Sequence, residues 1–340
     1  MMRERWRRFL RHWRRSLWRK FEELQRTFSV IDSMTMCNEQ DFTSRPILAI
    51  ATDRKGHSEM ATAAATVKPR PREATLPAAV KRVALVANEK GGVGKSVFTR
   101  TLVDHLRTAG KRVAAYDADG SVGATARVLG SRDAKGLVER IQNPVAGIGY
   151  YNGRADDERN TLLDSIESGE RLYIHDLAGG LLADLTRIVD GGEGLDGLLD
   201  AFEAHGYRLT VFHVISPDVG AAQSVARWLS LIGDKADHVA VINLRHGKPP
   251  ADFPFWYGFT DAKGLAKGGK TREALLALGG VEIEFPALPA GTFAKLDAEN
   301  IPFTRADKAG LLTITERAHV AKFLRDFATA LTPALPLLGL

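Results

Sequence analysis

Short apolar runs alternate with amphipathic segments along residues 80–335, and this alternation predicts a sheet covered by helices. The predicted strands are the short, mostly apolar runs at 83–87, 112–116, 172–175, 209–215, 239–242 and 281–285. The predicted helices, in which apolar residues recur at spacings of three and four, are 95–109, 155–168, 181–190, 219–232, 271–278 and 314–331. Strands that are buried on both faces and separated by helices are typical of parallel sheets. We therefore predict an α/β fold, a mostly parallel twisted sheet with helices on both faces.

The first thirty residues follow a different pattern, in which apolar side chains at helical spacing are surrounded by arginines. The apolar positions are Trp6, Leu10, Trp13, Leu17, Phe21, Leu24 and Phe28. This spacing predicts a basic amphipathic helix over residues 1–30. Three interpretations stay open: the helix lies on an anionic membrane surface, it binds nucleic acid through its arginines, or it is not native because translation starts at Met60.

The next segment, residues 31–79, shows no sustained hydrophobic period. Residues 61–72 are rich in alanine, threonine and proline, and this composition predicts a disordered linker. The chain is therefore divided into the helix at 1–30, the linker at 31–79, a folded domain at 80–335 and a short tail at 336–340.

The positive charge is concentrated at the start of the chain. The net charge is +6, and residues 1–28 carry ten basic and three acidic side chains, which leaves the other 312 residues at −1. A large basic face on the folded domain is therefore not implied. Cys37 is the only cysteine, so no disulfide forms within one chain. Without an apolar run of 18 residues or a secretory h-region, we expect a cytoplasmic protein.

The segment between the first predicted strand and helix has the pattern of a phosphate-binding loop. It reads Lys90, Gly91, Gly92, Val93, Gly94, Lys95 and Ser96. Its glycines let backbone N–H groups approach phosphate oxygens, and the N-terminus of the following helix favours negative charge. Lys95 is expected to reach the β- and γ-phosphates, and the Ser96 hydroxyl to ligate Mg²⁺. Glu89 stands where the general pattern has its first glycine, and the additional lysine, Lys90, follows it.

This early lysine resembles the deviant Walker A motif of the ParA/MinD family of P-loop ATPases, and the resemblance covers residues 82 to about 330. It implies that ATP and Mg²⁺ bind at residues 91–96. It also implies that Lys90 crosses a dimer interface to the partner's nucleotide, so that the chain forms a homodimer when ATP binds. Phosphoryl transfer is catalysed mainly by positioned positive charge, which makes a lysine donated in trans chemically reasonable. Nonspecific DNA or a partner protein are further expected partners.

Polar residues at the ends of predicted strands complete the candidate site, because ligands of such sheets gather at the carboxyl ends of the strands. Asp117 and Asp119 end the second strand, Asp176 the third and Asn243 the fifth. By the resemblance, Asp176 holds Mg²⁺ through water, Asp119 orients the attacking water or the metal shell, and Asn243 contacts the adenine base. The alternatives are ordinary loop acids at Asp119 and Asp176, and a strand-end cap at Asn243.

The chain departs from the family pattern at several positions. Val97 lacks the hydroxyl that the family places at the α-phosphate, which should weaken nucleotide binding by about 1 kcal/mol. Gly120 and Ser121 replace a Pro-Gln pair, so hydrolysis is expected to be slow or differently gated. Residues 244–280 form an insertion rich in aromatic residues, which is either a partner-binding surface or a loop that covers the domain's own core.

These features predict an ATP-dependent dimerising switch that hydrolyses ATP to ADP and phosphate, in plasmid or chromosome partition or in plasmid transfer. Two alternatives are kept: an ATP-dependent small-molecule ligase of the dethiobiotin synthetase type, and a nucleotide-binding scaffold with little turnover. Lys90 argues against the ligase, because those relatives carry the ordinary loop without the early lysine.

Overall fold

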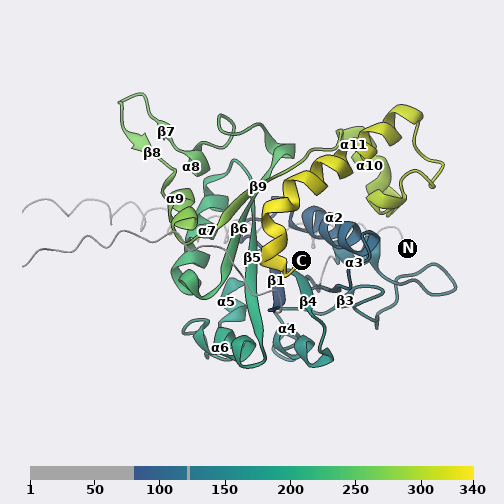
Figure 1. Ribbon diagram of the computed structural model, residues 1–340, viewed down its shortest axis with the longest axis horizontal. Coiled ribbons are helices and arrows are strands. Elements are labelled where there is room, and N and C mark those ends of the chain that lie inside the picture. Colours follow the sequence, from purple (N-terminus) through teal and green to yellow (C-terminus); the bar gives the residue numbers. More distant parts are fainter. Residues whose placement is uncertain (1–79, 121–122) are drawn as a thin grey trace, which may run out of the picture. The chain divides into compact units, whose positions relative to one another are not determined.

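A seven-stranded sheet forms the centre of the computed structural model, which describes residues 80–120 and 123–340 (Figure 1). Its strands, in chain order, are β1 (Lys81–Ala87), β2 (Ala114–Asp117), β3 (Gly149–Tyr150), β4 (Leu172–Asp176), β5 (Tyr207–Ile215), β6 (Asp237–Asn243) and β9 (Val281–Phe285). Their spatial order is β3-β2-β4-β1-β5-β6-β9, and all six neighbouring pairs are parallel. The predicted parallel α/β fold is confirmed. The sequence pattern missed only the two-residue β3 in this sheet.

Helices cover both faces of the sheet, as predicted. They are α2 (Lys95–Thr108), α3 (Ala124–Leu129), α4 (Thr161–Asp164), α5 (Leu182–Leu185), α6 (Asp196–Ala204), α7 (Val219–Ile232), α8 (Pro254–Tyr257), α9 (Lys270–Ala277), α10 (Ala290–Ala298) and α11 (Ile314–Leu331). Short 3₁₀ helices lie at Ser165–Ser168, Gly233–Lys235, Leu244–His246, Phe303–Arg305 and Thr332–Leu338.

Two predicted helices are much shorter than their patterns suggested. The prediction at 155–168 yields only α4 and the 3₁₀ turn after it, and that at 181–190 yields only α5. After Leu185 the backbone N–H groups of Arg187 and Ile188 donate to carbonyls three residues back (3.1 Å each), so the α-helical pattern is not continued. Asp190 then belongs to the entry into α6, because its carboxylate accepts hydrogen bonds from the backbone N–H groups of Gly197 (2.6 Å) and Leu198 (3.2 Å).

Alternate residues of β1 point into two separate cores, because successive strand side chains face opposite sides of a sheet. Ala84 and Val86 belong to the core beneath α2 and α11, whereas Val83 and Leu85 belong to the core that includes residues of α6 and α7. β1 is thus buried on both faces, which explains why its sequence is a continuous apolar run rather than an alternating one.

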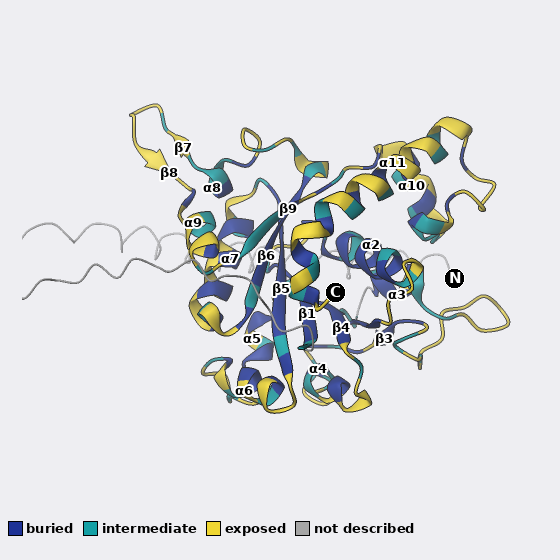
Figure 2. Cartoon of the chain, in the orientation of Figure 1, coloured by how far each residue is buried: buried dark blue, intermediate teal, exposed yellow. Residues whose placement is uncertain are grey.

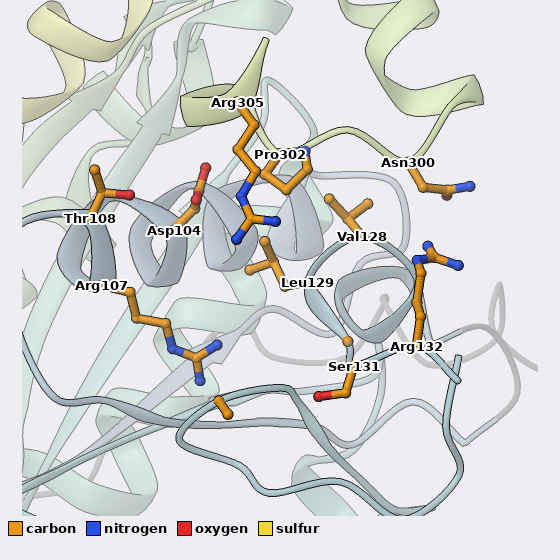
Figure 3. Close-up of a pocket in the computed structure, with 12 residues that line it drawn as sticks. Asp104, Arg107, Thr108, Val128, Leu129, Ser131, Arg132, Asn300, Pro302 and Arg305 are labelled. Carbon is orange, nitrogen blue, oxygen red and sulfur yellow. The ribbon is translucent and has the colours of Figure 1, made fainter. Parts of the chain in front are cut away.

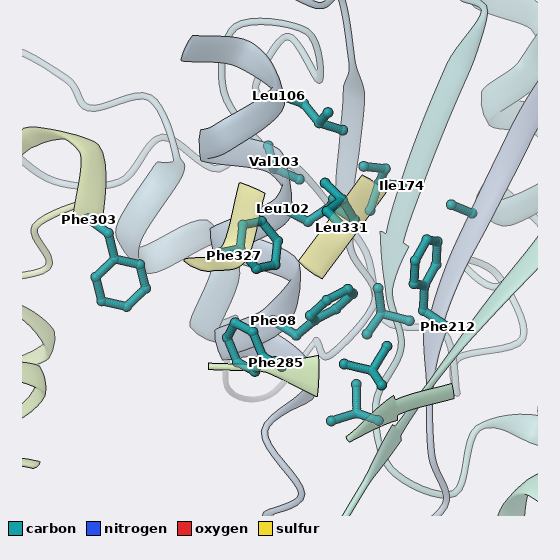
Figure 4. Close-up of a cluster of buried hydrophobic side chains, with 14 of the residues drawn as sticks. Phe98, Leu102, Val103, Leu106, Ile174, Phe212, Phe285, Phe303, Phe327 and Leu331 are labelled. Atoms are coloured by element: carbon teal, nitrogen blue, oxygen red, sulfur yellow. The ribbon is translucent and has the colours of Figure 1, made fainter. Parts of the chain in front are cut away.

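Four phenylalanines fix α2 against the sheet (Figure 4). The ring centroid of Phe98 on α2 lies 5.5 Å from that of Phe212, 5.4 Å from that of Phe285 and 6.1 Å from that of Phe327. All four rings are buried, and tilted or edge-to-face pairs at these distances add to the free energy of burial. Because Phe98 lies one turn into α2, this cluster holds the start of the helix, and with it the glycine loop, in a fixed position.

The aromatic residues of the insertion mainly cover the domain's own core. Phe253 and Trp256 are 0% and 1% exposed, and they pack in a cluster with residues of β5, β6 and α7. The Trp256 Nε1–H donates to Glu282 (2.8 Å). The interpretation as a core-covering loop is therefore correct for these two residues. Beyond them, β7 (Phe259–Thr260) and β8 (Ala266–Lys267) form an exposed hairpin (Figure 2).

The end of the chain packs against the sheet. Within the 3₁₀ helix Thr332–Leu338, Ala334 and Leu338 are buried in the core beneath α11, and the Thr210 hydroxyl donates to the Leu337 carbonyl (2.6 Å). Residues 336–340, expected to be a tail, thus make contacts of the folded domain. The predicted N-terminal helix at 1–30, the linker at 31–79 and Ser121 lie outside the described residues. Within the described part, no helix is both long and apolar enough to cross a membrane.

Candidate functional site

The glycine loop joins the end of β1 to the start of α2, as predicted. Gly92 and Gly94 have φ angles of 76° and 102°, a region that favours glycine. A Cβ at Gly94 would lie only 2.4 Å from Asn243 Nδ2. The first turn of α2 contains no acidic residue, so the positive end of this helix is not neutralised within that turn. This loop has the conformation and the electrostatics that a phosphate group needs.

Side chains before the glycines anchor the loop to neighbouring elements. The Asn88 amide donates to the carbonyls of Val214 (2.9 Å) and Ala221 (3.2 Å). The backbone N–H of Glu89 donates to Ser224 Oγ (2.8 Å) on α7. Glu89 stands where the usual motif has its first glycine, and its backbone is held by this bond to α7.

Lys95 curls back over its own loop and is 8% exposed. Its Nζ donates to the carbonyls of Asn88 (3.0 Å) and Lys90 (3.3 Å). Burial lowers the pKa of the Lys95 amine, and the nearby charges of Asp176, Glu89 and Asp119 oppose this shift. Carbonyl oxygens are weak partners for a buried cation, which leaves this amine ready for a stronger anionic partner.

The predicted acids of β2 and β4 meet at neighbouring strand ends. Asp117 and Asp176 are register partners and are 0% and 2% exposed. Asp176 Oδ2 accepts from the Thr125 hydroxyl (2.6 Å), whereas its buried Oδ1 has no hydrogen-bond partner among the described residues. Asp117 accepts from the backbone N–H groups of Asp119 (3.1 Å), Thr125 (2.9 Å) and Ala126 (3.1 Å). The structure therefore brings both strand-end acids to the start of α3.

Burial dominates the ionisation of this acidic pair. It raises the pKa of Asp117 to about 7, with the charge of Asp176 acting in the same direction and the three backbone donors opposing it. Burial also raises the pKa of the Asp176 carboxyl, against the hydrogen bond from Thr125 and the charge of Lys95. Two buried carboxyls on neighbouring strand ends resist simultaneous ionisation unless a cation lies near them.

Lys90 lies in a different environment from Lys95. Its Nζ is 3.4 Å from Asp218 Oδ1, and the two side chains are 44% and 49% exposed. Asp218 is the N-cap residue of α7 and accepts from the Ser216 hydroxyl (2.9 Å). This hydroxyl lowers the pKa of Asp218, and Lys90 contributes to the same shift. The Lys90 amine thus faces outward from the loop and is held by an exposed ion pair, which is weak.

Asn243, the last residue of β6, fastens the loop. Its Nδ2 donates to the Val93 carbonyl (2.8 Å), and its Oδ1 accepts from the backbone N–H of Arg245 (3.1 Å). The strand-end cap considered for Asn243 is therefore present. Asn243 also lines a cavity of about 160 Å³ together with Gly94, Val97 and Pro286. A contact between Asn243 and an adenine base stays a prediction.

Sequence reasoning missed two residues that the fold brings to the site. Thr125 on α3 bonds to Asp176, but α3 is too short to show a helical pattern. Arg154, in the segment after β3, donates from Nη2 to the Gly179 carbonyl, and its charge reaches Lys95. Gly179 itself touches the loop, since a Cβ there would lie 3.2 Å from the Glu89 carbonyl oxygen. The sequence carried no signal for Arg154, because the two-residue strand β3 that precedes it was not predicted either.

A central strand, a glycine loop with a buried lysine, and an acid at the end of the adjacent strand define a P-loop nucleotide-binding domain. Residues 84–227 match the model of the CobQ/CobB/MinD/ParA nucleotide binding domain. Over these residues the chain is similar to this family, whose description includes the MinD and ParA proteins that the deviant loop resembles.

Several known proteins are similar to the chain. The ATP-dependent dethiobiotin synthetase BioD of Mycolicibacterium gilvum is 28% identical over 240 residues, which are 67% of this chain and 96% of that protein. The septum site-determining protein MinD of Pyrococcus horikoshii, solved with Mg-ADP, is 14% identical with a TM-score of 0.42, covering 72% of this chain and 95% of its own. A nucleotide-binding protein of Archaeoglobus fulgidus, solved with ADP, is 19% identical with a TM-score of 0.36, covering 65% of this chain and 86% of its own.

Proposed function

We propose that this protein is an ATP-dependent dimerising switch of the ParA/MinD type, which hydrolyses ATP to ADP and phosphate and serves in plasmid or chromosome partition or in plasmid transfer. The observation that carries the proposal is the contrast between two lysines of one loop. Lys95 is buried against loop carbonyls, where the nucleotide's phosphates would replace them. Lys90 is held outside the loop by an exposed ion pair to Asp218. Because the Lys90 amine makes no contact with the carbonyls of its own loop within the described residues, it is available to bind the phosphates of a nucleotide in a second subunit.

The residues at the loop fit Mg²⁺ together with a nucleotide. Asp176 offers an Oδ1 without a hydrogen-bond partner among the described residues. Ser96 lies nearby, because the Thr125 hydroxyl that bonds to Asp176 is also 3.4 Å from the Ser96 carbonyl oxygen. Among the described residues, no group of three or more His, Cys, Asp or Glu side chains is arranged to hold a metal by itself. This suits Mg²⁺, which takes one or two protein oxygens and completes its shell with phosphates and water. Mg²⁺ would neutralise charge on the phosphates, while Asp176 and Ser96 hold it in place.

The chemistry assigned to this chain's own residues is positioning and charge stabilisation. Lys95 and the N–H groups of the loop would bind the β- and γ-phosphates, and Lys90 would add a positive charge from the partner subunit. Asp119, whose charge already reaches Lys95, would orient the attacking water. Such preorganised charges account for most of the catalysis in phosphoryl transfer.

We expect the Mg²⁺-dependent part of ADP affinity to increase about tenfold between pH 6 and pH 8. The raised pKa of Asp117, about 7, keeps the acidic pair partly protonated at pH 6. A cation binds the deprotonated pair better, so affinity rises as pH rises through 7. Calorimetry with and without Mg²⁺ at both pH values measures this. In the Asp117→Asn variant residue 117 cannot titrate, so any remaining change in affinity with pH should come from the phosphates of ADP alone. An equal change in affinity for the wild type and the variant contradicts the prediction.

Replacing Arg154 by alanine should lower the rate of ATP hydrolysis about tenfold and change ATP affinity less than threefold. The guanidinium lies at the Gly179 segment and close to Lys95, where it can stabilise charge that develops on the terminal phosphate. Single-turnover hydrolysis with the wild type and the Arg154→Ala and Arg154→Lys variants tests this role. The lysine variant should recover part of the rate, and an unchanged rate in the alanine variant would exclude the role.

Sedimentation velocity with and without ATP and Mg²⁺ tests the switch. We expect a monomer without nucleotide and a dimer with ATP, and we expect ATP hydrolysis to increase when nonspecific duplex DNA or a partner protein is added. Repeating the DNA experiment at two salt concentrations shows whether phosphate contacts drive binding. A sedimentation coefficient that ATP does not change would refute the switch.

The similarity to dethiobiotin synthetase supports a second candidate, an ATP-dependent small-molecule ligase. It rests on 28% identity over 240 residues that span nearly the whole relative. Formation of dethiobiotin from its precursor with ATP, under conditions in which DNA has no effect, would favour this candidate. A basal hydrolysis that needs no organic substrate would favour the switch.

A further inference from the structure

A second cavity lies at the other end of α2, away from the glycine loop (Figure 3). Its volume is about 530 Å³, and its walls come from the last turn of α2, the end of α3 and the segments that follow α3 and α10. The polar residues that matter here are Asp104, Arg107, Ser131, Arg132, Asn300 and Arg305. From Lys95 to Arg107 the helix advances about 18 Å at 1.5 Å per residue. This cavity is therefore separate from the proposed nucleotide site.

Arg107 is a fixed, partly buried cation for which the described residues provide no carboxylate partner. Its Nη2 donates to the carbonyls of Val113 (3.0 Å), Pro144 (2.6 Å) and Gly147 (2.9 Å). Its Nε is buried and has no acceptor among the described residues. Burial lowers the pKa of Arg107 to about 10, opposed by the charge of Asp104. Such a cation remains charged at neutral pH and would be stabilised by an anion in the cavity.

The other two arginines of the cavity are also unneutralised. Arg132 donates only to carbonyls, those of Gly136 and Arg127. Arg305 is exposed, and its side chain makes no hydrogen bond or ion pair within the described residues. Figure 3 shows the guanidinium group of Arg305 directed from the segment at Pro302 toward Leu129, whereas that of Arg107 points away from α2, on the side of its acceptors at Pro144 and Gly147. Both residues line the cavity.

The single acid of the lining does not balance this charge. The Asp104 carboxylate accepts from the backbone N–H (3.0 Å) and the hydroxyl (2.7 Å) of Thr304, and it forms no ion pair with an arginine in the described part of the chain. Elsewhere several arginines of the described chain pair with acids, for example Arg100 with Asp297 and Arg112 with Glu170. In this cavity, three guanidinium groups for which the described residues provide no ion pair share one lining.

We propose that this cavity binds the phosphate group of a small phosphorylated molecule. Guanidinium groups present forked donors that match phosphate oxygens, and Ser131 and Asn300 add uncharged polar groups at the rim. Val128, Leu129 and Pro302 provide an apolar wall for the remainder of the ligand. A volume of about 530 Å³ lies in the range of pockets for small ligands. A phosphate of duplex DNA is the other source of the same chemistry, and the experiment separates the two.

The test is calorimetry of the full-length protein with sodium pyrophosphate as the probe. It is done in the Lys95→Ala background, so that the glycine loop contributes little and the outcome does not depend on ATP hydrolysis. We expect saturable binding of pyrophosphate. Arg305→Ala and Arg132→Ala should each weaken it about tenfold. Arg325→Ala, which removes an exposed arginine of α11 outside the cavity, should change it less than twofold.

The stability of the variants and two binding outcomes determine whether the proposal holds. Because Arg305 and Arg132 are exposed, their variants should melt within a few degrees of the parent protein, and a circular dichroism melt verifies this. Absence of pyrophosphate binding, or equal binding by the three arginine variants, overturns the proposal. Binding of a 20-base-pair DNA duplex that depends on Arg132 and Arg305, without pyrophosphate binding, also overturns it and assigns the cavity to nucleic acid.

Discussion

Replacing Lys95 by alanine should reduce the affinity for ADP and ATP about 100-fold. The amine is 8% exposed and donates only at 3.0 and 3.3 Å to carbonyls of its own loop. Bound phosphates would offer it far stronger, charge-assisted hydrogen bonds, and losing them costs about 3 kcal/mol. Titration calorimetry with Mg-ADP measures the loss.

The matched control for this experiment is Lys111→Ala, which removes an exposed lysine just beyond the other end of α2. It should leave the affinity unchanged within twofold. Because removing Lys95 also removes a buried cation, the variant should not be less stable than the wild type by more than about 1 kcal/mol. Full affinity in Lys95→Ala would show that the loop does not bind phosphates through this lysine.

Replacing Lys90 by alanine should abolish ATP-dependent dimerisation while leaving ATP affinity of the monomer within about threefold. The amine contacts none of the loop's own carbonyls in the described structure and lies at the surface beside Asp218. Its loss therefore removes a contact to the partner subunit and little within the subunit. Sedimentation velocity with ATP and Mg²⁺, at protein concentrations where the wild type is fully dimeric, gives the answer.

Asp218→Asn is the companion variant for Lys90. It removes the charge that holds the amine in the ligand-free subunit, so dimerisation should persist and require slightly less ATP. An exposed pair contributes at most about 1 kcal/mol, which limits the gain to about fivefold. If Lys90→Ala dimerises normally with ATP, the deviant-loop assignment is wrong, whatever the result for Asp218.

Buried periodic segments could be predicted from the sequence because local pattern and tertiary packing agree there. The helices at 219–232 and 314–331 have the predicted bounds, and α11 begins with a capping box between Thr313 and Glu316. The short helix α3 could not be predicted in this way. α3 spans only six residues, and the backbone N–H groups at its start are satisfied by Asp117 from a different strand. A partner that is distant in the sequence leaves no sign in the local hydrophobic pattern.

The candidate site also has one part that could be predicted from the sequence and one part that could not. The loop and the acids at the strand ends followed from sequence order, since parallel strands bring their carboxyl ends to one edge. The partners of these residues did not. The bond from Thr125 to Asp176 and the bond from Asn243 to Val93 join residues 51 and 150 positions apart. Arg154 was missed for the same reason, because only the folded sheet places it beside Gly179.

The contact between Gly339 and the start of β1 has a practical consequence. A Cβ at Gly339 would lie 3.1 Å from the Val80 carbonyl oxygen, so residue 80 and the last residues of the chain share the amino-terminal rim of the sheet. The nucleotide loop is at the opposite rim, where β1 ends. A fluorescent protein or affinity handle fused after Leu340 is thus attached on the side remote from the glycines. Such a fusion would leave the rim that carries the nucleotide loop uncovered.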